Sequence, residues 1–510
     1  MRAKGAAFFP ILALALAVSH PSRAQEIPAP VDKKEAISRA QQAAAVEDCA
    51  GVLGALDPLV PGLAKGDERT LVQRLRLICL GREGRYDELA AVQGELAATL
   101  PRDGVVRAFG VIVALGQSRF ADAADQLSNL AASSPASLNI LTGAAVREIS
   151  TRLQATSAFA VRDKMMIALA RADWQPSDIP ELRVGFAESA IGALIAQGEP
   201  DEAEGLLERI EQPEQLVSMM VDRQYTAIWP ALETRLGPAS GLSIDRFALD
   251  KLTTYADTPG TDSVLRDAAN AMLLLGRYSE VIDMTKDVQV VQGMSRDAVQ
   301  TMLMRSRAFA ILRRNDDAAR VMAPFMALDP AHSPDVATAL ITYAEFLDET
   351  GQEARALEVA RAARIKTSGV LNPFGQRWLD RTEICALSAL GRAKEASAAI
   401  DRIRPLFAEN HAAVIEALLC AQRDAEAGEL AEKAFADKDA GTELIYQFQP
   451  GGSLMGAAPS RLRDLWTAFL AKPAIKAAFE KRGRLLPRTY WPESKPRAIP
   501  RRSARGETLT

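Results

Sequence analysis

A repeated 34-residue phrase is the feature that most constrains how this chain can fold. The stretch GREGRYDELAAVQGELAATLPRD, Gly81 to Asp103, is followed by GQSRFADAADQLSNLAASSPAS, Gly116 to Ser137. Their prolines, Pro101 and Pro135, lie 34 residues apart. Similar phrases, which follow apolar runs of helical character, begin at Gly198, Gly276, Arg314, Gly351, Gly391 and Arg423. A period of this length predicts a stack of small, similar units rather than one globular core.

Each part of the phrase fits a helical hairpin. The glycine tolerates the left-handed backbone at the end of a first helix. The acidic residues that follow lie in the first turn of a second helix, where they complement the helix dipole. A small residue, usually Ala, lets the two helices approach closely, and Pro ends the unit because it cannot continue a helix. One hairpin cannot cover its own apolar stripe, so stacked copies are expected to bury each other's and form an α-solenoid.

The period, the small residue after the acids and the final Pro resemble the tetratricopeptide repeat family. The resemblance covers residues 68–136, 185–212 and 262–436, and the remaining parts, 137–184 and 213–261, contain helical runs without the full phrase. Aromatic residues are only 5% of the chain, which also favours helix over sheet. The resemblance implies an all-α superhelix of about nine to ten antiparallel hairpins, closed by a C-terminal capping helix pair.

The two ends of the chain differ from this pattern. Residues 1–24 combine basic Arg2 and Lys4, an apolar run and the small residues of Ser22-Arg23-Ala24. This predicts a cleavable signal peptide cut after Ala24, and hence a periplasmic or secreted protein; an uncleaved anchor is the alternative. We predict an N-terminal capping hairpin over 25–67, the solenoid over 68–440, a loop and capping helices over 441–490, and a basic disordered tail over 491–510.

The charge of the chain is uneven. The formal net charge is −4, and it becomes −7 once the three basic residues of the first 24 are removed. A moderately acidic body argues against nucleic-acid binding. Residues 472–510, by contrast, contain eleven Lys and Arg and three Glu. This basic end either docks on the acidic solenoid or on phosphate-rich envelope surfaces, or it is a solubilising tail.

Four cysteines in an exported chain indicate disulfides. In the hairpin model, Cys49 begins one helix and Cys79 nearly ends the next, so an antiparallel arrangement predicts a Cys49–Cys79 bridge. Cys385 and Cys420 fall on successive first helices, facing the inner surface. A bridge needs Cα atoms within about 7 Å, and neighbouring first helices are often further apart. A second bridge and two buried free thiols therefore remain open.

The family resemblance also implies a binding surface, since such solenoids usually bind along the concave face formed by the first helices. The family's inner positions correspond to Gln300, Arg307, Glu345, Asp348, Glu349, Trp378, Arg381 and Glu416. Trp378 beside Arg381 is the pair most typical of a groove, an aromatic anchor with a bidentate donor. The alternative is a solvated helix face without a partner.

Motifs for chemistry are missing from the sequence. It has no zinc-binding motif, phosphate-binding loop, dinucleotide loop or nucleophile elbow, and no cofactor is predicted. We therefore expect no enzyme but a scaffold or adaptor that binds an envelope protein or an extended peptide. One alternative is an enzyme or enzyme accessory that acts on cell-wall or envelope polysaccharide, and another is a small-ligand sensor.

Overall fold

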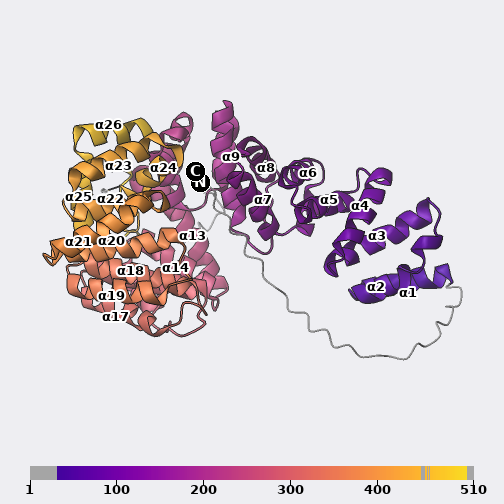
Figure 1. The fold of residues 1–510 in the computed structure, drawn as a ribbon, viewed down its shortest axis with the longest axis horizontal. Helices are drawn as coiled ribbons and strands as arrows, with labels where there is room; N and C mark the ends of the chain where they lie inside the picture. Colours follow the sequence, from indigo (N-terminus) through magenta and orange to yellow (C-terminus); the bar gives the residue numbers. More distant parts are fainter. Residues whose placement is uncertain (1–31, 450–453, 457, 459, 502–510) are drawn as a thin grey trace. The chain divides into compact units, whose positions relative to one another are not determined.

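The computed structural model describes residues 32–449, 454–456, 458 and 460–501. The predicted signal peptide lies outside these residues. Within them the chain is helical, and its only β-type pairing is an isolated bridge between Asp222 and Gly483. The chain divides into two compact units at Leu141. Figure 1 labels the helices along the chain. The predicted all-α fold is confirmed for the described residues, in which consecutive helices pack against each other in pairs.

The first unit consists of three helical hairpins. Asp32 and Asp48 cap α1 and α2 by accepting hydrogen bonds from backbone N–H groups of the first turn, as does Asp103 for α5. The helices are α1 (Lys33–Ala45), α2 (Cys49–Leu56), α3 (Asp67–Arg82), α4 (Tyr86–Thr99), α5 (Gly104–Gly116) and α6 (Phe120–Ser133).

The second unit continues the series of hairpins and ends in additional helices. Its first half comprises α7 (Gly143–Ala155), α8 (Phe159–Arg171), α9 (Leu182–Gln197), α10 (Pro200–Leu206), α11 (Pro213–Val221), α12 (Trp229–Leu236), α13 (Gly241–Asp257), α14 (Asp262–Leu274) and α15 (Tyr278–Met284). Its second half comprises α16 (Arg296–Ile311), α17 (Asn315–Met322), α18 (Asp335–Glu349), α19 (Glu353–Lys366), α20 (Pro373–Ala389), α21 (Ala393–Ile403), α22 (His411–Cys420), α23 (Asp424–Ala436), α24 (Lys438–Gln447), α25 (Arg461–Leu470) and α26 (Pro473–Arg482).

The hairpin turns have the left-handed residue that the phrase requires. Gly84, Gly276 and Gly391 have φ values of 69°, 72° and 73°. The same position is held by Ser118 with φ of 58° and by Ser157 with φ of 56°. At each turn the N–H of the following residue donates to a carbonyl five positions earlier, which satisfies the end of the first helix.

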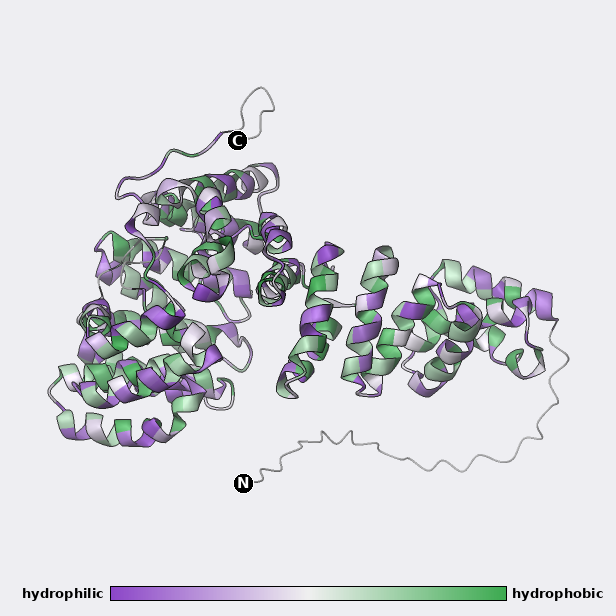
Figure 2. Ribbon diagram, turned by 90° about the horizontal axis from the view of Figure 1, so that it is seen from above, coloured by the Kyte–Doolittle hydropathy of each residue, from purple (hydrophilic) through white to green (hydrophobic). Residues whose placement is uncertain are grey.

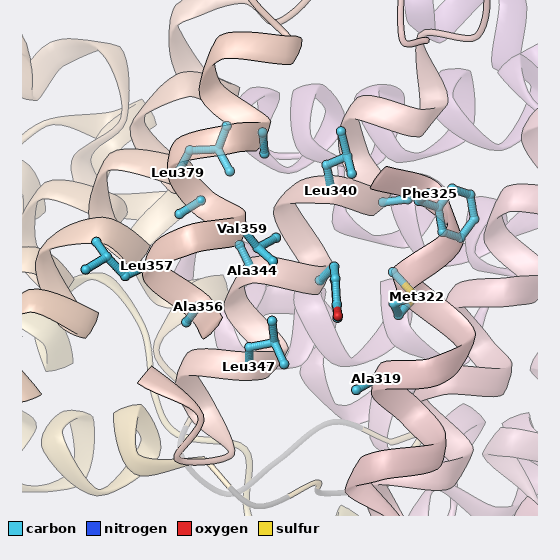
Figure 3. Packing of buried hydrophobic residues seen from close by; sticks show 14 of the residues in the cluster. Ala319, Met322, Phe325, Leu340, Ala344, Leu347, Ala356, Leu357, Val359 and Leu379 are labelled. Carbon is cyan, nitrogen blue, oxygen red and sulfur yellow. The ribbon is translucent and has the colours of Figure 1, made fainter. Parts of the chain in front are cut away.

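The core lies between successive hairpins. In the cluster of α16 to α21, Phe325, Leu340 and Leu347 are fully buried, and alanines such as Ala344 and Ala356 let the helices approach closely (Figure 3). Polar and apolar residues occupy different faces of the same helices (Figure 2). This amphipathic pattern is what a stack of hairpins needs, since each one covers the apolar stripe of the next.

Both pairs of cysteines form disulfides. Cys49 and Cys79 join α2 to α3 with Cα atoms 4.9 Å apart, as predicted. Cys385 and Cys420 join α20 to α22 with Cα atoms 5.0 Å apart. The question left open by the sequence is thus resolved by close packing: residues 412 to 420 of α22 are all buried, and alanines among them allow α20 to approach.

The C-terminal region differs from its prediction in two places. Residues 441–447, expected in a loop, belong to α24, which Asp437 caps through two backbone N–H groups. The expected disordered tail is ordered over 491–501: the N–H of Arg497 donates to the carbonyl of Leu275 at 2.8 Å, and its guanidinium pairs with Asp245 at 2.7 Å. This ion pair supports the alternative in which the basic end docks on the acidic solenoid, because Asp245 of α13 neutralises Arg497.

The last helices do more than cap the final hairpin. Helix α26 packs on α23 and α24, while the N–H of Arg484 donates to the carbonyl of Val221 at 2.8 Å. The Arg484 guanidinium also lies 3.5 Å from the centre of the Trp229 ring. The end of the second unit is therefore joined to its α11–α12 region. In the described part of the chain, none of the helices has the length and apolar character needed to cross a membrane.

Candidate functional site

The predicted inner positions lie on four helices that pack in series. Gln300 and Arg307 belong to α16, and Glu345, Asp348 and Glu349 to α18. Helix α20 provides Trp378 and Arg381, and α22 provides Glu416. Because α16, α18, α20 and α22 are consecutive first helices of their hairpins, their inner faces form one continuous surface.

Two adjacent cavities open on this surface. One has a volume of about 590 Å³ and is lined by α18, α20 and Gln447. The other, of about 430 Å³, is lined by α16, α18 and residues of the C-terminal region. Both share Thr342, Glu345 and Glu349 as a common wall. We call the two cavities together the inner cleft.

A buried cluster of charges forms the floor of the inner cleft. Arg381, which is 2% exposed, donates from Nη2 to Oε1 of Glu345 at 3.0 Å. Its Nε lies 2.8 Å from Oε2 of Glu416, a residue that is 1% exposed. The Arg381 guanidinium also lies 5.1 Å from the centre of the Trp378 ring. The arginine is thus held by two carboxylates and an aromatic ring, and it is not available as a bidentate donor to a partner.

The charges of the cluster shift each other's protonation. Burial raises the pKa of Glu345 to about 7, against the opposing effect of Arg381 and with a further upward contribution from Glu349. Burial also raises the pKa of Glu416, again opposed by Arg381. The pKa of Arg381 is raised, because the neighbouring carboxylates Glu416 and Glu345 outweigh the lowering effect of burial.

Two other predicted residues are bound by the C-terminal region. Oδ1 of Asp348, which is fully buried, accepts a hydrogen bond from Nη2 of Arg461 at 2.5 Å. Nη2 of Arg307 donates to the carbonyl of Gly456 at 3.2 Å. Oε1 of Glu416 also accepts from Nε1 of Trp466 at 3.1 Å. Asp348 and Glu416 therefore differ from the prediction of an exposed concave face, because Arg461 and Trp466 cover them.

The other predicted residues line the inner cleft. Gln300 and Arg307 line the smaller cavity, Trp378 and Arg381 the larger one, and Glu345 and Glu349 both. Within the described residues, Glu349 makes no hydrogen bond or ion pair. Six of the eight predicted residues therefore line a cavity, and the two buried acids Asp348 and Glu416 do not.

Phe374 was missed by the sequence prediction. It is 43% exposed and makes an edge-to-face contact with Trp378, with ring centres 6.2 Å apart. Its position four residues before Trp378 on the same helix is the signal that could have identified it. Contributions from Gln447, Met455 and Arg463 had no local signal, since they come from a distant part of the chain.

The chemistry available at the cleft is that of recognition. It offers an aromatic pair, hydroxyl and amide groups, two carboxylates and arginines. Among the described residues, no three His, Cys, Asp or Glu side chains are grouped as a metal site. His332 pairs with Asp329 at 2.8 Å and His411 with Glu443 at 3.1 Å, both away from the cleft lining.

Comparison with known proteins gives only distant structural similarity. No family model matches the chain, and no curated protein matches it. Among solved structures, the Cut9–Hcn1 hetero-tetramer of the APC/C is 10% identical, with 89% of this chain and 96% of that chain covered and a TM-score of 0.31. The P58(IPK) TPR domain is 13% identical, with 71% and 99% covered and a TM-score of 0.20. Yeast Tom70 is 11% identical, with 88% and 99% covered and a TM-score of 0.20. Nothing about the function of this chain follows from similarities at this level.

Proposed function

We propose that this chain is a non-catalytic scaffold, exported to the periplasm, that binds an extended peptide of another envelope protein in its inner cleft. The observation that carries the proposal is the continuous cleft across α16, α18 and α20, with Phe374 and Trp378 partly exposed at one end. Aromatic anchors in a concave surface are typical of sites that hold peptide side chains. The proposed export rests on the pattern of the first 24 residues.

Site-specific photo-crosslinking in intact cells tests this proposal. A photoreactive amino acid in place of Phe374 is expected to capture one envelope protein. The matched control is the same amino acid in place of Ile365 on α19, which is 78% exposed and outside the cleft lining. Equal capture from both positions, or capture of a cytoplasmic protein only, would contradict the proposal.

A catalytic or accessory role on envelope polysaccharide is the second candidate. It is favoured by one observation: Glu345, with its pKa of about 7, lines the cleft beside the carboxylate of Glu349. A carboxyl group that titrates near neutrality can exchange protons with a substrate. Release of soluble fragments from purified envelope glycan, lost in Glu345→Gln, would establish this role and exclude a purely non-catalytic scaffold.

A further inference from the structure

The C-terminal region sends one segment along the inner surface of the second unit. We call residues 454–466, as far as they are described, the inner segment. Leu454 packs into the apolar cluster of Ile244, Phe247 and Leu274 on α13 and α14. Further along, Ala458 packs against Phe309 and Ala310 of α16.

Polar contacts continue the same path across the next helices. The carbonyl of Gly456 accepts from Arg307 of α16 at 3.2 Å. Arg461 then donates to Asp348 of α18 at 2.5 Å, and the Trp466 indole N–H donates to Glu416 of α22 at 3.1 Å. The segment thus contacts α16, α18 and α22 in the order of the chain, first through residues outside any helix and then through the first turns of α25.

A small residue is required where the segment passes the start of α15. A Cβ atom added to Gly456 would lie 2.2 Å from the hydroxyl oxygen of Tyr278. Gly456 also has φ of 90°, a conformation that side chains rarely allow. The bound sequence therefore has three fixed features: bulky apolar residues at 454 and 455, glycine at 456 and arginine at 461.

The polar contacts of the inner segment are incompletely satisfied. Three buried atoms along it have no hydrogen-bond partner in the described structure, namely Nε of Arg307, Oδ2 of Asp348 and Nε of Arg461. A buried donor or acceptor without a protein partner makes this docking weaker than a fully hydrogen-bonded one. The segment also leaves space beside it, because Met455, Ala458 and Arg463 form one wall of the 430 Å³ cavity.

We infer that the inner segment occupies, within the same chain, the path of the partner peptide, and that the partner binds by displacing it. The partner then presents the same chemistry: two bulky apolar residues, a glycine, and an arginine five positions after the glycine. This inference rests on the proposed function, and it identifies the class of peptide and the competition that controls its binding. The charge match is specific, because the acceptor for the partner's arginine is the buried carboxylate of Asp348.

A synthetic peptide with the sequence of residues 454–466 is the probe for this competition. Its affinity for the full-length chain and for Arg461→Ala is measured by fluorescence anisotropy. The variant loses the charged hydrogen bond that holds the segment in place, so the probe is expected to bind it about tenfold more tightly or better. Lys476→Ala is the control, since Lys476 lies on α26, outside the lining of both cavities, and pairs with the exposed Glu480 at 3.8 Å.

Two further measurements separate the possible explanations. A probe with alanine in place of the arginine that corresponds to Arg461 is expected to lose the gain on Arg461→Ala, because Asp348 then has no new partner. Circular dichroism confirms that both variants keep the helical content of the parent chain. Equal probe affinity for the parent, Arg461→Ala and Lys476→Ala overturns the inference.

The crosslinking and probe experiments fail independently. If the photoreactive residue at position 374 captures an envelope protein and the probe does not displace it, the scaffold function stands and the competition is refuted. If no protein is captured but the probe binds as expected, the inner cleft is a peptide site, and the proposal of an envelope protein as its partner is wrong.

Discussion

Replacing Arg381 by methionine tests the central charge cluster most directly. Arg381 is 2% exposed and holds Glu345 and Glu416 at 3.0 and 2.8 Å. Methionine keeps much of the side-chain volume and can still contact the Trp378 ring, so the substitution mainly removes charge. What remains is a pair of acidic side chains, one of them fully enclosed, without their common cation.

The expected loss of stability follows from the burial of these carboxylates. Removing one partner of a buried ion pair costs about 3–5 kcal/mol. Burial already raises the pKa values of both carboxyl groups, so uptake of protons at lower pH relieves part of this cost, and the loss is smaller at pH 5 than at pH 8. The second unit spans 142–510. For a unit of that size, a change of 1 kcal/mol in the free energy of unfolding shifts the unfolding temperature by about 1.3 °C. We therefore expect the unfolding temperature of Arg381→Met to lie about 5 °C below that of the parent chain at pH 8.

Differential scanning calorimetry of the full chain at pH 5 and pH 8 measures this difference. Arg392→Met is the control, because the side chains of Arg392 and of its partner Glu395 are 40% and 49% exposed at the surface of the fold. It is expected to change the midpoint by less than about 1 °C, in line with exposed ion pairs. If Arg381→Met behaves like this control at pH 8, the cluster does not carry the stability assigned to it.

Three further outcomes are expected. The pKa of Glu345 is raised to about 7, so the folded state binds more protons than the unfolded state between about pH 4.5 and pH 7. Stability is therefore lost as pH rises through this window. Thermal scans should show a smaller loss for Glu345→Gln. Replacing Cys385 and Cys420 by serine opens a loop of 35 residues and should lower the unfolding free energy in urea by about 4 kcal/mol, an effect absent when the parent is already reduced. Arg497→Ala removes the pair with Asp245 and should speed hydrogen exchange over 491–501 while changing the unfolding free energy by less than about 1 kcal/mol.

Local features of the fold could be read from the sequence because the repeat phrase encodes them locally. Gly84 and Gly276 mark turns that need a left-handed residue, and the structure has this geometry there. The α7–α8 hairpin was not recognised as a copy, although Ser157-Ala158-Phe159 holds the place of Gly84-Arg85-Tyr86. The absence of an acid in the first turn of α8 conceals the motif, since the copy with Ser118 at the left-handed position keeps Asp122 and was recognised.

The candidate site was only partly predictable, since half of its environment comes from far along the chain. The inner positions of α16, α18 and α20 follow from the repeat register, and Trp378 and Glu349 do line the cleft. Arg461 and Asp348 are 113 residues apart, and no periodic pattern relates them. The course of the inner segment is decided by tertiary contacts, which a short-range pattern does not contain.

Covering the inner surface changes which of its residues can serve a partner. On an open solenoid, arginines and acids of the inner face would be hydrated, and leaving them unpaired would cost little. Once the inner segment excludes water, a buried charge is destabilising unless it is paired, so Arg381, Glu416 and Asp348 become structural. The side chains left for recognition are those that line a cavity and form no such ion pair, among them Phe374 and Glu349. Displacement of the segment would return Asp348 to the binding surface, and a partner with an arginine would replace the charge that was removed.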